Sequence, residues 1–166
     1  MNWALPLGAS QPPTATRKRC NYMNQSTLTN TALTVLRVIV GFIFAAHGWQ
    51  KFTEFTIAGT QAAFGKMGVP AADVVAPIVS TIELVGGIAL IAGVLTRVFA
   101  ALLALDMLGA LFLVHAPAGL FADKGGYELV LALAAAAAAV ALTGAGRISI
   151  DAAVFGRKGS KLGILA

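Results

Sequence analysis

The sequence predicts an all-α integral membrane protein, an antiparallel four-helix bundle with both termini in the cytoplasm. Composition carries the membrane assignment: 58% of the 166 residues are hydrophobic, 11% are charged, and the mean hydropathy is +0.82. A soluble domain has about 25% charged residues, so this chain lacks the polar surface that water requires. Its length fits one domain, and no segment alternates with the two-residue period of a transmembrane strand.

The chain divides into a central membrane domain and two polar tails. Residues 1–30 are rich in Pro, Ser, Thr and Asn and carry a basic cluster at 17–19, so we expect a disordered N-terminal tail. Residues 31–155 form the membrane domain, and residues 156–166 form a basic C-terminal tail. No cleavage site follows the first apolar run, so that run is expected to be retained.

Two features of the N-terminal tail leave questions open. Met23 is a second possible translation start, and the sequence does not decide between it and Met1. Cys20 is the single cysteine of the chain, which excludes an intrachain disulfide and a dithiol redox pair. Its own role is not given by the sequence.

Four apolar segments are close to the length of a membrane-spanning helix. The expected spans cover about residues 31–49, 73–95, 98–116 and 127–143, of which the last is short. Only residues 96–97 separate the second and third spans, so these two must form a tight antiparallel hairpin. The 50–72 connection is the longest, and part of it is expected to be a short interfacial helix. Six consecutive alanines in the last span predict close helix packing.

The distribution of Lys and Arg sets the expected orientation. Eight of these residues lie in the tails and the hairpin on the side of the termini, and three, Lys51, Lys66 and Lys124, lie on the other side. Basic residues gather on the cytoplasmic side, so both termini are expected there. Because the basic residues cluster beyond the ends of the spans, the net charge of +5 indicates membrane topology and not a nucleic-acid partner.

Three ionisable residues fall inside the predicted spans, where a charge costs about 2.5–3.5 kcal/mol. Arg37, Glu83 and Asp106 lie about 9, 18 and 13 Å from the cytoplasmic ends of their spans, at 1.5 Å per residue. We therefore expect them to meet in one buried cluster, the candidate catalytic core. Two interpretations stay open: a proton-exchanging site with one protonated carboxyl, serving a quinone or redox partner, or an ion-pair network that fixes helix packing.

A second polar group is expected toward the external face. It comprises His47, Lys51, His115, Tyr127 and Glu128. His47 and Lys51 share one helix face because they are four residues apart, and histidine can transfer protons near neutral pH. The group is either a pocket for a quinone head group with a proton entry, or a polar cap at the level of the lipid head groups. No ligand spacing predicts a metal site.

Helix geometry limits how these groups can cooperate. Asp106 and His115 are nine residues apart, which is about 180° around an ideal helix. They cannot both face one axis unless the helix bends, and Pro117 follows too late to bend it between them. The sequence therefore predicts no continuous relay through the third span.

The order of several short motifs resembles the DoxX family of small four-helix bacterial membrane proteins. The most extended of them are Ala46-His47-Gly48-Trp49-Gln50-Lys51, Glu83-Leu84-Val85-Gly86-Gly87, Gly125-Gly126-Tyr127-Glu128 and Leu142-Thr143-Gly144-Ala145-Gly146-Arg147. The resemblance covers about residues 31–155 and implies a multi-pass protein of the bacterial cytoplasmic (inner) membrane. The family supplies no established catalytic residues, so the polar positions above are candidates, and Asp106 lies outside the matched motifs.

The resemblance implies a redox role. One branch of the family is similar to a subunit of thiosulfate:quinone oxidoreductase, and an actinobacterial relative is associated with a membrane complex containing superoxide dismutase and a thiosulfate sulfurtransferase. We therefore expect a membrane-embedded subunit or anchor that handles quinone and protons, linked to sulfur oxidation or oxidative-stress defence, and not a stand-alone enzyme. The expected partners are the lipid bilayer and either soluble redox proteins or a second membrane subunit; a homo-oligomer stays open.

Two other functions stay open at this stage. The chain is also compatible with a non-enzymatic scaffold that recruits soluble redox proteins through its basic tails, or with a small transporter or channel. It has no cysteine in a span, no dinucleotide fingerprint and no haem-attachment motif. An electron donor would therefore be a separate protein, and the sequence identifies neither that donor nor the substrate.

Overall fold

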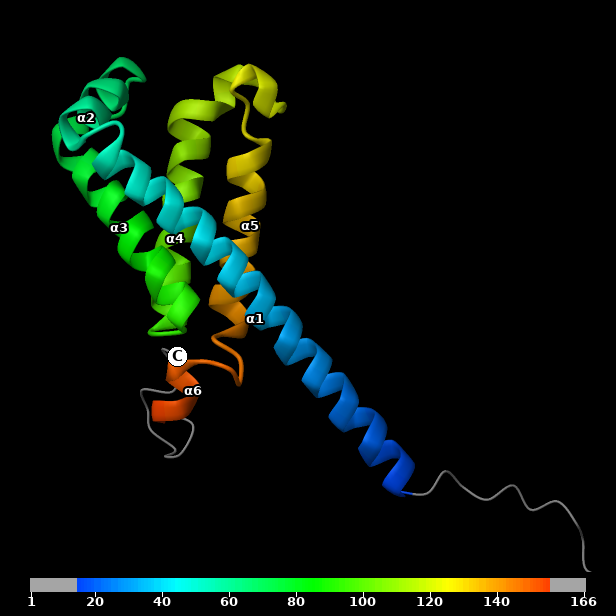
Figure 1. Cartoon of the computed structure of the whole chain (residues 1–166). Helices are drawn as coiled ribbons and strands as arrows, with labels where there is room; N and C mark the ends of the chain where they lie inside the picture. The colour runs from blue at the N-terminus through cyan, green and yellow to red at the C-terminus, as the bar shows by residue number, and fades with distance from the viewer. Residues whose placement is uncertain (1–14, 156–166) are drawn as a thin grey trace, which may run out of the picture.

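The structure, a computed structural model, describes residues 15–155, and every regular element in that range is helical (Figure 1). The elements, in order, are α1 (Ala15–Thr53), α2 (Ile57–Lys66), α3 (Ala72–Ala92), α4 (Thr96–Ala110), a π turn (Leu111–His115), two 3₁₀ turns (Ala116–Ala118 and Ala122–Lys124), α5 (Glu128–Thr143) and α6 (Ile150–Phe155). The all-helical prediction is confirmed.

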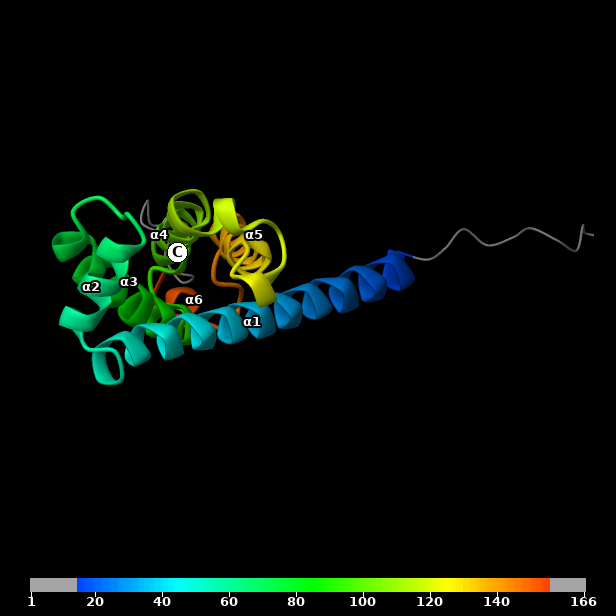
Figure 2. The same cartoon turned by 90° about the horizontal axis from the view of Figure 1, so that it is seen from above.

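Three of the helices are long and apolar enough to cross a membrane. They are the apolar part of α1 (Thr27–Thr53), α3, and α4 with the turns that continue it to Ala118, while α5 is apolar but only 16 residues long. Helix α1 packs against α3 and α5, and α4 packs against the same two helices. Seen from two directions, α1 crosses the other helices obliquely and its N-terminal part extends past them (Figures 1 and 2).

The first helix begins earlier than the sequence predicts. Helix α1 starts at Ala15, so residues 15–30 are helical and not the disordered tail that was expected. This stretch contains neither Pro nor Gly, so nothing in it interrupts a helix that continues from the apolar segment. The rest of the expected N-terminal tail, residues 1–14, and the C-terminal tail, residues 156–166, lie outside the described residues.

Small residues bring α1 and α3 into close contact. A Cβ atom added at Gly48 would lie 2.4 Å from the backbone nitrogen of Leu84, and one added at Gly87 would lie 2.4 Å from the backbone nitrogen of Ala45. Real Cβ atoms do not approach other atoms this closely, so the crossing requires glycine at these positions. The contact fixes which residues of the two helices face each other.

The predicted tight hairpin between the second and third spans is confirmed, and the C-terminal segment fastens it. Three residues, 93–95, connect α3 to α4, with Gly93 and Leu95 at φ +73° and +45°. The Asp151 carboxylate accepts hydrogen bonds from the backbone N–H groups of Leu95 and Thr96 and from the Thr96 hydroxyl, at 2.9–3.0 Å. Asp151 thus caps the N-terminus of α4 from a distant part of the chain.

The 50–72 connection contains a short helix as predicted, α2, which docks on α3. Pro77 lies inside α3 and has no N–H group, so the carbonyl of Asp73 lacks its usual helical donor. The side-chain amide of Gln61, on α2, donates to that carbonyl at 2.7 Å. The proline therefore creates the acceptor that holds α2 in place.

Candidate functional site

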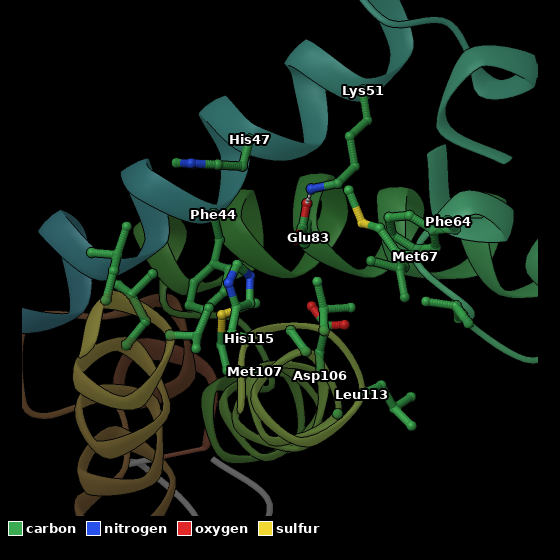
Figure 3. Close-up of a pocket in the computed structure, with 18 of the residues that line it drawn as sticks. Phe44, His47, Lys51, Phe64, Met67, Glu83, Asp106, Met107, Leu113 and His115 are labelled. Carbon is green, nitrogen blue, oxygen red and sulfur yellow. Dashed lines mark hydrogen bonds and ion pairs between the residues drawn. The ribbon is translucent and has the colours of Figure 1, made fainter. Parts of the chain in front are cut away.

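A cavity of about 490 Å³ lies beneath α2 and between α1, α3, α4 and α5. Its walls are mostly apolar and include side chains from every one of these helices, among them Ile43, Phe44, Phe64, Val79, Met107 and Leu133. Five side chains that can carry a charge also line it: His47, Lys51, Glu83, Asp106 and His115 (Figure 3). All five are candidates from the sequence, so the structure brings members of both predicted groups together in one site.

Lys51 and Glu83 form an ion pair at the wall of the cavity. The Lys51 Nζ atom, on α1, contacts Glu83 Oε2, on α3 (Figure 3). The side chain of Glu83 is 5% exposed and that of Lys51 is 16% exposed. Gly48 lies one helical turn before Lys51 and touches Leu84, so the close crossing of α1 and α3 places the two charges side by side. From the sequence, these two residues were expected in different clusters.

Asp106 faces the same cavity from α4 and has no cation of its own. Its Oδ2 atom is buried and makes no hydrogen bond to any described residue. Lys51, which also lines the cavity, is already engaged by Glu83 (Figure 3). A polar atom buried without a partner is costly, which marks Asp106 as the group that a ligand in the cavity would engage.

His115 reaches the cavity because the helix changes its winding. After Ala110 the chain makes a π turn over Leu111–His115, which adds one residue to the turn. The nine-residue separation from Asp106 then acts as about eight, so the angle between the two side chains falls from about 180° to about 80°. The expectation that these two residues cannot face one axis holds only for a regular helix. The π turn changes the winding, and both residues line one cavity.

Both histidines use one ring nitrogen to bind a backbone carbonyl. His115 Nδ1 lies 2.7 Å from the carbonyl oxygen of Gly125, and His47 Nδ1 lies 2.9 Å from that of Ile43. Since a carbonyl only accepts, Nδ1 carries the hydrogen in each ring, which leaves Nε2 as an acceptor when the ring is neutral. In Figure 3 the His47 ring points away from the ion pair, whereas His115 points into the middle of the cavity.

Arg37 does not join the two carboxylates, so the expected three-residue cluster is wrong for this residue. The antiparallel packing of α1 and α3 places Arg37 beside Gly93, at the opposite end of α3 from the cavity. Its guanidinium donates to the carbonyl of Ile148 at 2.9 Å. Arg37 thus fastens α1 to the C-terminal segment that carries Asp151 and lies outside the cavity lining.

Tyr127 and Glu128 also lie outside the cavity lining. Tyr127 packs against the hydrophobic core, and Glu128 is exposed at the start of α5. Their backbone N–H groups bind the carbonyl groups of residues 119 and 120, at 3.0 and 2.9 Å. These bonds hold the loop in which the Gly125 carbonyl accepts from His115. Tyr127 and Glu128 therefore support the site without lining the cavity.

The site as a whole is an apolar cavity lined by an ion pair, two histidines and Asp106, whose Oδ2 atom makes no hydrogen bond to a described residue. Ligand pockets have volumes of about 300–1,000 Å³ and few, precisely placed polar groups, and this cavity matches both features. Fold and site together define an all-helical membrane protein with a ligand-sized cavity among its spanning helices. The chain belongs to the DoxX family, whose model matches residues 32–116.

Curated relatives extend this assignment over most of the chain. "Putative oxidoreductase CatD" of Bacillus subtilis is 37% identical over 85% of this chain and 97% of its own length. "Inner membrane protein YqjF" of Escherichia coli is 32% identical over 75% of this chain and 92% of its own length. An uncharacterized membrane protein, Rv3486 of Mycobacterium tuberculosis, is 38% identical over 47% of each chain. No solved structure matches the chain.

Proposed function

We propose that this chain is the membrane-embedded, quinone-binding subunit of a redox system and that the cavity holds the quinone head group. The observation that carries the proposal is the cavity itself, a ligand-sized apolar space with a small polar cluster at one wall. A quinone head group is a flat apolar ring with two carbonyl oxygens, which suits such walls. The B. subtilis relative carries the name "Putative oxidoreductase CatD", which supports a redox setting.

In this proposal the residues of the cavity serve the protons of the reaction. Reduction of a quinone to a quinol takes two electrons and two protons, one proton for each carbonyl oxygen. A separate redox protein supplies the two electrons. Asp106 and His115 face the ring and are placed to deliver protons, since one has a carboxyl oxygen without a partner and the other an imidazole nitrogen that can take up a proton.

The proposal also gives the protein a topology. Helices α1, α3 and α4 span the cytoplasmic membrane, and α5 is the fourth span, which at 1.5 Å per residue is about 24 Å long. The excess of Lys and Arg at the hairpin and tails supports an orientation with both termini in the cytoplasm. The cavity then opens near the external side, and labelling of single cysteines introduced at Lys66 and Asp123 from outside intact cells tests this orientation.

Binding of a quinone analogue to the purified protein in lipid nanodiscs tests the function. A Cβ atom added at Gly109 meets no atom within 4 Å, and Gly109 lines the cavity. Gly109→Phe should therefore fill the space and abolish binding, while Gly109→Ala should retain it. Glu83→Gln should weaken binding by freeing Lys51 to pair with Asp106. Undiminished binding by Gly109→Phe would remove the cavity as the site.

A further inference from the structure

We infer that Asp106 stands in the cavity as a neutral carboxylic acid that donates a hydrogen bond, so that the site accepts a neutral carbonyl ligand and excludes an oxyanion. The inference rests on the proposed function, because it names the class of ligand and the group that meets it. The observations behind it are the pairing of Lys51 with Glu83 and the lack of a partner at Asp106 Oδ2.

The titratable side chains that line the cavity with Asp106 come from three elements. Helix α1 contributes Lys51 and His47, α3 contributes Glu83, and the π turn contributes His115; among the described residues, no other titratable side chain lines the cavity. Lys51 and Glu83 cancel each other because they are in contact. An ionised Asp106 would then leave a net negative charge in an apolar cavity inside the membrane, which is strongly unfavourable.

A neutral Asp106 avoids this buried negative charge and can also donate a hydrogen bond. A protonated carboxyl has one O–H donor, whereas a carboxylate has none. The Oδ2 atom of Asp106 makes no hydrogen bond to any described residue. The O–H group is therefore available to a carbonyl oxygen of a ligand in the cavity. A buried acid kept neutral so that it can donate a hydrogen bond is a known way of holding a carbonyl oxygen.

The same balance disfavours small anions. An oxyanion such as thiosulfate needs positive charge or several N–H donors around it, and the lysine of this cavity is already neutralised. An anion would have to separate Lys51 from Glu83 and leave the glutamate alone in the apolar wall. The cavity is therefore suited to bind a quinone and not a sulfur oxyanion.

Infrared spectroscopy of the protein in nanodiscs tests the inference without any ligand. A carbonyl stretching band of a protonated carboxylic acid should be present in the wild type and absent in Asp106→Asn. Glu83→Gln should also remove it, because Lys51 would then lose its partner and draw a proton from Asp106. The matched control is Asp123→Asn, an exposed aspartate near the surface loop, which should leave the band intact. Absence of the band in the wild type would overturn the inference.

Binding of a quinone analogue gives the second test. Asp106→Asn retains a neutral donor and should bind nearly as well as the wild type, whereas Asp106→Leu should bind about five- to tenfold more weakly, the loss of one hydrogen bond. Excess thiosulfate should not displace the analogue. Loss of binding in Asp106→Asn, or displacement by thiosulfate, would overturn the inference and leave the proposed function standing. Failure of the wild type to bind any quinone analogue would instead refute the proposed function, with the infrared band still deciding the state of Asp106.

Discussion

Lys51 near the end of α1 and Glu83 in the middle of α3 form an ion pair across a helix crossing that is built on glycine. The pair lies at the wall of an apolar cavity that also contains Asp106 and His115. The crossing of α1 and α3 links packing to function. It brings Lys51 to Glu83, and among the described residues Asp106 is then the cavity carboxyl without an ion-pair partner. The account of the site depends on that division of roles between two carboxylates.

Removal of one member of the ion pair should destabilise the protein. Lys51→Met leaves Glu83 charged and almost fully buried, and breaking a buried pair costs about 3–5 kcal/mol. The free energy of unfolding in detergent micelles, measured by circular dichroism, should fall by that amount. The double variant Lys51→Met with Glu83→Leu should recover most of the loss, because no uncompensated charge remains. A Lys51→Met protein as stable as the wild type would show that the pair is not buried as described.

The glycine at the helix crossing should tolerate no side chain. Gly48→Ala forces a methyl group against the backbone of Leu84, and overpacking of this kind costs about 1–3 kcal/mol. The variant should melt at a lower temperature and should bind the quinone analogue more weakly, because α1 and α3 separate. Gly65→Ala is the matched control, since a Cβ atom there meets nothing within 4 Å. Equal melting temperatures for the two variants would contradict the close crossing.

The carboxylate of Asp151 should contribute to the stability of the α3–α4 hairpin. It accepts three hydrogen bonds at the start of α4, and loss of a helix cap with charge-assisted bonds costs about 1–3 kcal/mol. Asp151→Ala should be more destabilising than Asp151→Asn, which keeps one carbonyl oxygen as an acceptor. Chemical denaturation would measure both. The control Asp123→Ala removes an exposed aspartate and should change stability little.

Gln61 and Pro77 both act on the backbone carbonyl of Asp73, so the effects of substituting these two residues should be coupled. Gln61→Ala removes the donor to Asp73 and should speed hydrogen exchange and proteolysis in α2. Pro77→Ala supplies a backbone N–H that can bind the same carbonyl within α3. In the Pro77→Ala background, Gln61→Ala should therefore have a smaller effect on hydrogen exchange and proteolysis in α2. Identical effects in both backgrounds would show that the amide and the proline act independently.

Much of the fold can be predicted from the pattern of apolar segments in the sequence. The apolar segments locate α3, α4 and α5 to within a few residues, and the two-residue gap after the second span predicts the hairpin. The candidate site residues can also be identified from the sequence, because ionisable side chains in or beside an apolar span are energetically costly and mark a functional or structural site. They are Glu83, Asp106, Lys51, His47 and His115.

The pairing of these candidates could not be predicted, because it depends on tertiary geometry. Depth along separate spans suggested that Arg37 meets Glu83, yet the α1–α3 crossing places Arg37 beside Gly93 and Lys51 beside Glu83. The π turn that moves His115 toward Asp106 has no sequence signature that we recognised. From the sequence, Asp151 has no expected role, and its function as a cap becomes visible only once the C-terminal segment is placed beside the start of α4.

The most direct test of the central claim is photo-crosslinking with a quinone analogue that carries the reactive group on its ring, followed by peptide mapping. The account predicts labels on side chains that line the cavity, such as Phe64, Met67, Met107 and Leu113, and loss of those labels in Gly109→Phe. Labels confined to exposed apolar residues outside the cavity, such as Phe42, Leu105 and Leu142, would contradict it, because they would show the quinone dissolved in the surrounding lipid and not held by the protein.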